Sequence, residues 1–194
     1  MDFKKHLETA WNLTLKYIAS LIIMTFIMFV VSFFTLGILA PVTMAGYTQS
    51  ILLMLREKRE PKISDLFSQF HLFLPLLAFA IVVAIVTVIG FMLLILPGFI
   101  IILLVSFACI YMVPLMVDKK LNLIDAVKES YSMSIRGVLV DNIVVVLIYI
   151  GNCMIGSSVA VGTLFTQPLA TIFLLSVYET KIKTGSQEKV APKQ

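Results

Sequence analysis

The sequence predicts an all-α polytopic membrane protein, with six transmembrane helices arranged as three hairpins and an interfacial amphipathic helix before each hairpin. Hydrophobic residues make up 60% of the 194 residues and charged residues only 13%, whereas about 25% of the residues in a soluble domain are charged. The mean hydropathy is +1.03. The runs Leu72–Leu96 and Gly98–Val117 carry no formal charge, and each has the length, about 20 residues, that a helix needs to cross a bilayer.

The first predicted unit begins with an interfacial helix. Between Asp2 and Lys16, apolar residues recur every four positions at Phe3, Leu7, Trp11 and Leu15. This spacing places them along one side of a helix that lies at the membrane surface. Tyr17–Gly37 is the first predicted span. Pro41–Leu55 is the second, because proline is favoured in the first turn of a helix.

The second predicted unit follows the charged loop Arg56–Lys62. Ser64 and Asp65 are typical helix caps and predict a second interfacial helix. The third and fourth spans are Leu72–Leu96 and Gly98–Val117, which meet at a Pro-Gly break. Pro114 lacks a backbone donor and predicts a bend near the end of the fourth span.

The third predicted unit contains the clearest amphipathic segment. Its apolar stripe consists of Leu121, Ile124, Val127, Tyr131 and Ile135, which predicts a helix lying on the cytoplasmic face. The spans Val138–Gly156 and Thr163–Tyr178 follow, and Pro168 marks the entry to the last one. Residues 181–194 are polar, and their composition predicts a flexible cytoplasmic tail.

These units predict one membrane domain, residues 1–180, built from approximate repeats 2–60, 61–120 and 121–180. The hairpin breaks are expected at Gly37, Pro41, Pro97, Gly98 and Pro168. Internal repeats are common in membrane folds. The alternative is that any six-span protein with short loops shows a similar rhythm.

The distribution of the basic residues predicts the topology. All 15 Lys and Arg residues lie in the N-terminal segment, the loop after Leu55, the region from Lys119 to Arg136 or the tail, and the three breaks carry no charge. The positive-inside rule then places both termini in the cytoplasm. We therefore interpret the net charge of +4 as a topology signal, and we expect no nucleic-acid partner.

Four polar side chains inside the predicted spans are the candidate functional residues: Asp141, Asn142, Asn152 and Gln167. An intramembrane acid suggests a transport or proton-linked role by default. A structural role near the headgroups is the alternative for Asp141, because it lies only five residues after Arg136. Cys109 and Cys153 fall in apolar segments, where cysteine usually acts as a small hydrophobic residue.

Small residues gather near the last break, in the patterns Gly156-x3-Ala160 and Ser158-x3-Gly162. Such patterns permit close approach of helices. They predict intramolecular packing, with a homo-oligomer interface or a cavity lining as alternatives.

Several residues resemble the bacterial YciC-like family of multi-pass membrane proteins. They are Leu96-Pro97-Gly98, Pro114, Val117-Asp118, Asp125-Ala126, Ser130 and Gly137. A similar membrane domain is fused to some glycerophosphodiester phosphodiesterases, but no phosphodiesterase domain is present here. The resemblance implies a six-helix protein of the plasma (inner) membrane and no particular reaction.

The usual catalytic motifs are absent. The sequence contains no GxxxxGK[ST], GxGxxG, HExxH or CxxC motif, so we expect no enzyme activity, no cofactor and no metal site. His71 is expected to pack at the interface, with a ligand or proton-relay role as the alternative. Two functions remain open: a non-enzymatic protein that organises lipid or a membrane partner, and a transporter or channel for small solutes or lipids.

Overall fold

The computed structural model describes residues 2–93, 95–135, 139–157 and 162–190, and every regular element in these ranges is a helix. The elements are α1 (Phe3–Lys16), α2 (Ile18–Phe34), α3 (Ala40–Glu57), η1 (Ile63–Phe67), η2 (Phe70–Leu72), α4 (Phe73–Leu93), α5 (Ile95–Cys109), α6 (Met112–Asp118), α7 (Leu123–Ile135), α8 (Leu139–Ser157) and α9 (Gly162–Val190). The all-helical class is therefore confirmed. Helix α9 continues into the segment that the sequence predicts as a flexible tail.

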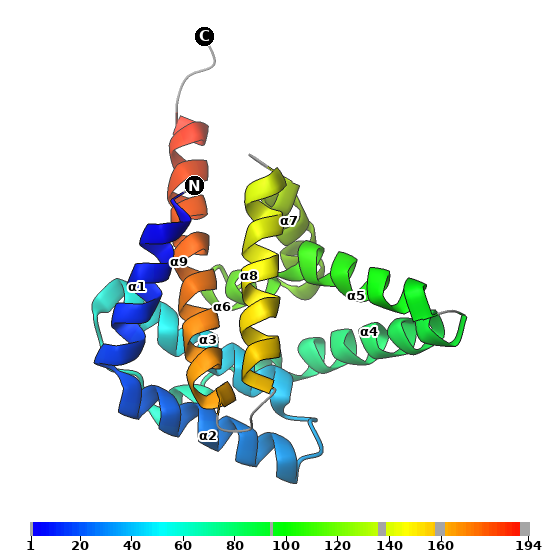
Figure 1. Ribbon diagram of the computed structural model, residues 1–194, viewed down its shortest axis with the longest axis horizontal. Helices are drawn as coiled ribbons and strands as arrows, with labels where there is room; N and C mark the ends of the chain where they lie inside the picture. The colour runs from blue at the N-terminus through cyan, green and yellow to red at the C-terminus, as the bar shows by residue number, and fades with distance from the viewer. Residues whose placement is uncertain (1, 94, 136–138, 158–161, 191–194) are drawn as a thin grey trace.

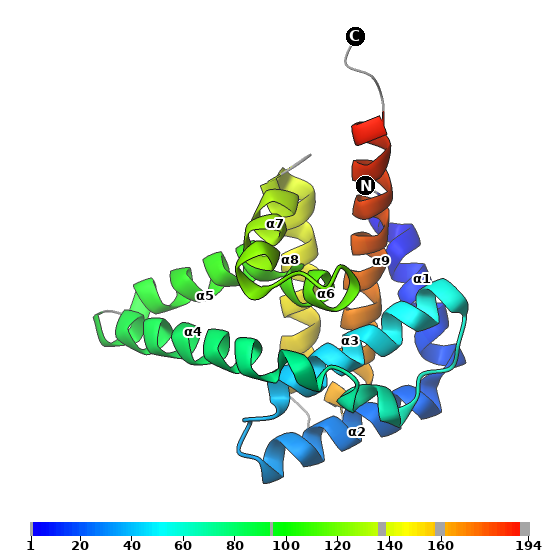
Figure 2. The ribbon, with the colours of Figure 1, turned by 180° about the vertical axis from the view of Figure 1, so that it is seen from behind.

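The helices are arranged around α3 and α9. Helices α8 and α9 run side by side, α1 lies along α9, and α2 and α3 lie across the lower part of the molecule (Figure 1). The paired helices α4 and α5 project away from this body in both views (Figure 2). The chain thus forms a helical body with one protruding hairpin.

Two helical segments are long and apolar enough to cross a membrane, Ile63–Met92 and Gly98–Asp118. Only 11% and 33% of their most apolar windows are buried within the protein. Two bent pairs, α1 with α2 and α7 with α8, raise the number of candidate spans in the described residues to four. By length and composition, α3 and α9 do not qualify, although the sequence predicts a span in each.

The interfacial helices predicted before the first and third hairpins form as separate helices. Helix α1 meets α2 at 88°, and α7 meets α8 at 114°. The corresponding prediction for the second hairpin is wrong, since η1 and η2 are short 3₁₀-helices. The carboxylate of Asp65, predicted as a helix cap, accepts from the Lys62 backbone N–H at 3.3 Å in a capping box at the start of η1. It also accepts hydrogen bonds from Ser50 at 2.7 Å and Arg59 at 2.6 Å. The contacts with Ser50 and Arg59 connect η1 to α3 and to the loop that precedes η1.

The hairpin breaks lie close to their predicted positions in the first two units. Gly37, with a φ of +82°, lies between α2 and α3, and Pro41 lies in the first turn of α3. Pro97 lies in the first turn of α5. A Cβ at Gly98 would come within 2.5 Å of the Phe91 ring, so this glycine permits α4 and α5 to pack closely.

The prediction that Pro168 opens the last span is wrong, because Pro168 lies inside α9, which begins at Gly162. A proline there removes one helical hydrogen bond without ending the helix. Residues 158–161, which include Ser158 and Ala160 of the small-residue patterns, lie outside the described residues.

The bend predicted at Pro114 is found one turn earlier, where α5 ends at Cys109 and α6 begins at Met112. The proline ring would clash with the carbonyl four residues before it, at Ile110. The helix is therefore interrupted at Ile110, the residue whose carbonyl the proline ring would otherwise contact.

Helices α3 and α9 form the core, together with α6. The largest fully buried side chains include Tyr47 on α3, Tyr111 at the start of α6, and Phe173 and Tyr178 on α9. Gly46 permits α3 to contact η1, because a Cβ there would lie 2.2 Å from the Leu66 carbonyl oxygen. The least apolar predicted spans are thus the inner helices.

Candidate functional site

An ion cluster joins the ends of α3 and α6 to the interior of α9. Arg56, at the end of α3, donates through Nε to Glu179 of α9 at 2.6 Å and through Nη2 to Asp118 of α6 at 2.9 Å. Its Nη1 also contacts Asp118. The hydroxyl of Tyr178 donates to the same Asp118 carboxylate at 3.0 Å. We call these four residues the ion cluster.

The ion cluster lies at the edge of the protein interior. The side chains of Asp118 and Glu179 are only 12% and 17% exposed, while Arg56 is 40% exposed. Charge-assisted hydrogen bonds to two carboxylates are among the stronger polar contacts in proteins. Because the residues are far apart in sequence, the cluster connects the second, fourth and sixth predicted spans at one end.

A second polar group lies beside the ion cluster. Lys181 of α9 donates to the Met133 carbonyl oxygen at 2.9 Å, and its Nζ lies 5.3 Å from the centre of the Tyr111 ring. The Tyr111 hydroxyl donates to Asn142 at 3.2 Å. Burial lowers the pKa of Lys181, and the negative charge of Asp141 opposes this shift. Asp141 and Asn142 thus belong to a group that holds α6, α7, α8 and α9 together.

Two serine hydroxyls on α7 donate hydrogen bonds to backbone carbonyls at the end of α5. Ser130 donates to the Ala108 carbonyl at 2.6 Å, and Ser134 donates to the Phe107 carbonyl at 2.8 Å. The backbone N–H of Tyr111 donates back to Ser130 at 3.2 Å. The last carbonyls of a helix lack partners within the helix. The small polar face of α7 therefore supplies hydrogen-bond partners for the backbone groups at the break between α5 and α6.

The structure separates the four polar residues that the sequence singles out. Asp141 and Asn142 lie in the first turn of α8, whereas Asn152 lies ten residues later, about 15 Å along the helix. Asn152 donates to the Ile148 carbonyl at 2.9 Å, and Gln167 donates to the Met44 sulfur at 3.4 Å. Asp141 and Asn142 therefore lie well away from Asn152 and Gln167.

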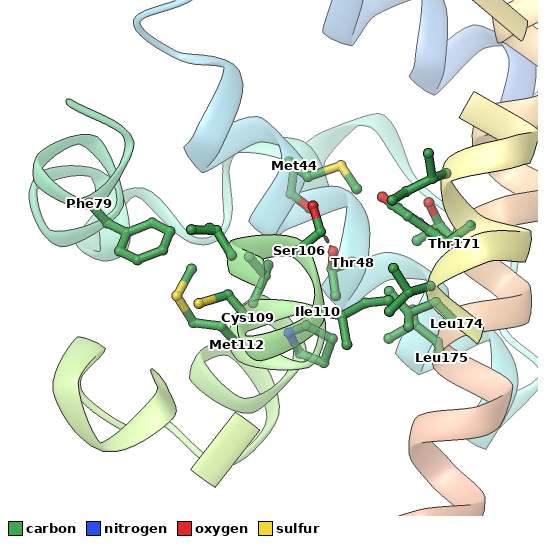
Figure 3. Close-up of a pocket in the computed structure, with 16 residues that line it drawn as sticks. Met44, Thr48, Phe79, Ser106, Cys109, Ile110, Met112, Thr171, Leu174 and Leu175 are labelled. Atoms are coloured by element: carbon green, nitrogen blue, oxygen red, sulfur yellow. Dashed lines mark hydrogen bonds between the residues drawn. The ribbon is translucent and has the colours of Figure 1, made fainter. Parts of the chain in front are cut away.

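An apolar pocket of about 270 Å³ lies between the hairpin and the body. Phe79 of α4 and Leu174 of α9 face it from opposite sides (Figure 3). None of the described residues that line it is charged. They are Met44, Thr48, Phe79, Val105, Ser106, Cys109, Ile110, Met112, Val113, Pro114, Val146, Tyr149, Ile150, Thr171, Leu174 and Leu175.

The two histidines lie apart. His6 on α1 is buried, with its Nδ1 2.7 Å from the Ser176 hydroxyl of α9. His71 in η2 is exposed. Within the described ranges, no three His, Cys, Asp or Glu side chains form a group that could hold a metal ion. Cys109 and Cys153 are free thiols.

Sequence reasoning missed the ion cluster and the pocket. Arg56 is interpreted as a topology signal and Asp118 as part of the family resemblance, although each lies at the end of an apolar run on the same predicted side. That shared position is the signal that could have indicated contact. The partners of Lys181 and Gly46 left no comparable pattern in the sequence.

Comparisons with known proteins add no assignment. No family model, curated protein or solved structure matches the chain. The resemblance to the YciC-like family remains a prediction.

Proposed function

We propose that the protein is a non-enzymatic, six-span protein of the plasma (inner) membrane that organises lipid around itself. The observation that carries this proposal is the apolar surface that faces outward. On the projecting hairpin, Val82 of α4 and Leu104 of α5 are 58% and 62% exposed. A soluble monomer rarely leaves so much contiguous apolar surface uncovered.

The outward sides of α1 and α7 support a role at the membrane surface. Leu7, Trp11 and Leu15 of α1 are all exposed, while His6, Ala10 and Thr14 on the other side are buried. On α7, Ile124, Tyr131 and Ile135 are exposed, while Ala126 and Ser130 are buried. Each helix therefore packs through one side, which on α7 also includes Met133, and presents on the other side an apolar stripe that suits the lipid interface.

The contacts between helix ends support six crossings. The Tyr17 hydroxyl, before α2, donates to the Lys58 carbonyl, after α3, at 3.1 Å. Arg56 then joins the end of α3 to the end of α6 and to Glu179, which lies inside α9 just after the sixth predicted span. Since the start of α2, the ends of α3 and α6, and this part of α9 meet on one side, each intervening pair of helices leaves that side and returns to it. This arrangement agrees with three hairpins and with cytoplasmic termini.

The transporter alternative has weaker support. A transporter needs polar groups that follow a path across the membrane. Here Asn142 binds Ser134 of α7 and Tyr111 beside α6 near one end, and Asn152 donates to its own helix. No observation on these residues favours transport over packing.

Cysteine labelling tests the topology. In a background without Cys109 and Cys153, a single cysteine at Lys119 or Lys183 should react with a membrane-impermeant maleimide only from the cytoplasm. A cysteine at Leu36 or Met92 should react only from outside. All four native side chains are exposed, so access does not limit the reaction. Labelling of position 92 from the cytoplasm would contradict the six-span topology.

Spin-labelled phospholipids test the role in lipid organisation. Replacing Leu7, Trp11 and Leu15 together by serine should reduce the fraction of motionally restricted lipid per protein in nanodiscs. Replacing exposed Glu8 and Asn12 by serine is the matched control on the same helix and should change little. An unchanged restricted fraction in the triple variant would contradict the lipid contact of α1.

A further inference from the structure

We propose that the apolar pocket between the hairpin and the body binds one acyl chain of a membrane phospholipid. The inference rests on the proposed function, which places α4, α5 and α8 in the bilayer. The rim of the pocket is partly exposed and includes Phe79, Val105 and Ile150. The floor is buried and includes Thr48 of α3, Pro114 of α6 and Leu174 of α9.

The chemistry of the walls selects an apolar occupant. The hydroxyl of Thr48 donates to the Met44 carbonyl at 2.8 Å, and that of Thr171 donates to the Gln167 carbonyl at 2.9 Å. Both threonine hydroxyls are thus satisfied by their own helices. A charged or strongly polar solute would lose its hydration here without gaining matching partners. A hydrocarbon chain loses nothing of this kind.

The size of the pocket is sufficient for a segment of an acyl chain. Its volume is about 270 Å³, and an engineered apolar cavity of about 150 Å³ in another protein binds benzene. An empty apolar space forfeits dispersion contacts along its walls. A lipid chain that enters from the bilayer restores them.

The position of the pocket explains how a chain reaches it. On α6, Pro114 in the floor precedes Asp118 of the ion cluster by four residues, about 6 Å along the helix. The ion cluster therefore lies just beyond the cytoplasmic end of the pocket. Open access remains at the rim formed by α4, α5 and α8, whose neighbouring outward residues Val82, Leu103 and Leu147 are all exposed and apolar. An acyl chain enters sideways through this rim.

Photocrosslinking tests the site. The full-length protein is reconstituted with phosphatidylglycerol that carries a diazirine in the middle of one acyl chain, and adducts are located by peptide mass spectrometry. We expect adducts on the floor residues Thr48, Pro114 and Leu174, which the structure buries away from bulk lipid. Adducts confined to outward residues such as Val82 and Leu103 would overturn the pocket but leave the proposed function intact. Absence of any adduct on α4 and α5 would overturn both.

A filling variant provides the matched comparison. Ser106→Phe places a ring at the pocket rim and should abolish the floor adducts. Leu104→Phe adds a ring to a residue of the same helix that is 62% exposed and should leave them unchanged. Ile150→Trp fills the pocket from α8 and replaces Ser106→Phe if that variant does not fold. Floor adducts that persist in a folded filling variant would refute the inference.

Discussion

Arg56 should contribute strongly to stability, because it is the cation of the ion cluster. Arg56→Met keeps an apolar stem but leaves Asp118 and Glu179, only 12% and 17% exposed, without their counter-ion. Breaking a buried pair typically costs about 3 to 5 kcal/mol, whereas exposed pairs contribute about 0.2 to 1 kcal/mol. Arg56 is 40% exposed, so solvent screening lowers the expected loss to about 2 to 4 kcal/mol.

Thermal unfolding in nanodiscs, followed by far-ultraviolet circular dichroism, measures this loss. For chains of about 150 to 250 residues, 1 kcal/mol shifts the midpoint by about 2 to 4 °C, so a loss of about 3 kcal/mol predicts a decrease of about 6 to 12 °C. Lys4→Met is the control, since Lys4 and Glu8 are 87% and 62% exposed and 3.9 Å apart. Its midpoint should change by less than about 2 °C.

Removing every charge of the cluster provides the critical comparison. The triple variant Arg56→Met/Asp118→Asn/Glu179→Gln leaves no uncompensated carboxylate and should recover part of the lost stability. Two results would refute the reasoning: a midpoint for Arg56→Met within about 2 °C of the wild type, or a triple variant less stable than the single one.

Three further predictions concern other contacts. Gly46→Ala places a Cβ 2.2 Å from the Leu66 carbonyl oxygen. Because overpacking costs about 1 to 3 kcal/mol, the midpoint of thermal unfolding should fall. An increase in the midpoint would show that η1 moves freely. Burial lowers the pKa of His6, an effect that the charge of Asp2 partly opposes. The unfolded chain therefore binds the proton more readily than the folded protein does. The free energy of unfolding should be at its full value above about pH 6.5 and should decrease as the pH falls through the folded pKa. His6→Gln should remove this dependence in pH-dependent melts, and an unchanged slope would exclude His6. Asp141→Asn should fold and express normally, with a stability loss of about 0.3 to 1 kcal/mol because Asp141 lies in the first turn of α8; failure to fold would show that it is essential to a buried charge pair.

The helical class and the positions of most helices follow from local patterns in the sequence. Apolar runs bounded by charged residues or by Pro and Gly predicted helices whose ends lie within a few residues of those in the structure. Proline and charged residues affect helix ends near their own positions in the sequence, so a local pattern is sufficient. The Pro114 break is one such case, and the separate helices α1 and α7 are others. The 3₁₀ form of η1 was not predicted. Asp65 caps the start of η1 through the Lys62 N–H, but it also binds Ser50 and Arg59, and the sequence does not show those contacts.

Which side chains meet, and which helix faces are inner, depends on how the helices pack in three dimensions. Lipid tails are as apolar as leucine, so an apolar pattern does not distinguish a helix surface that faces lipid from one that faces protein. The inner helices α3 and α9 are less apolar than α4 and α5, but their sequences do not show which of their faces meets which neighbour. Arg56 and Glu179 lie 123 positions apart, and no local rule pairs residues across such a separation. The ion cluster, the backbone approach at Gly46 and the pocket arise from packing between hairpins, which is a property of the folded chain.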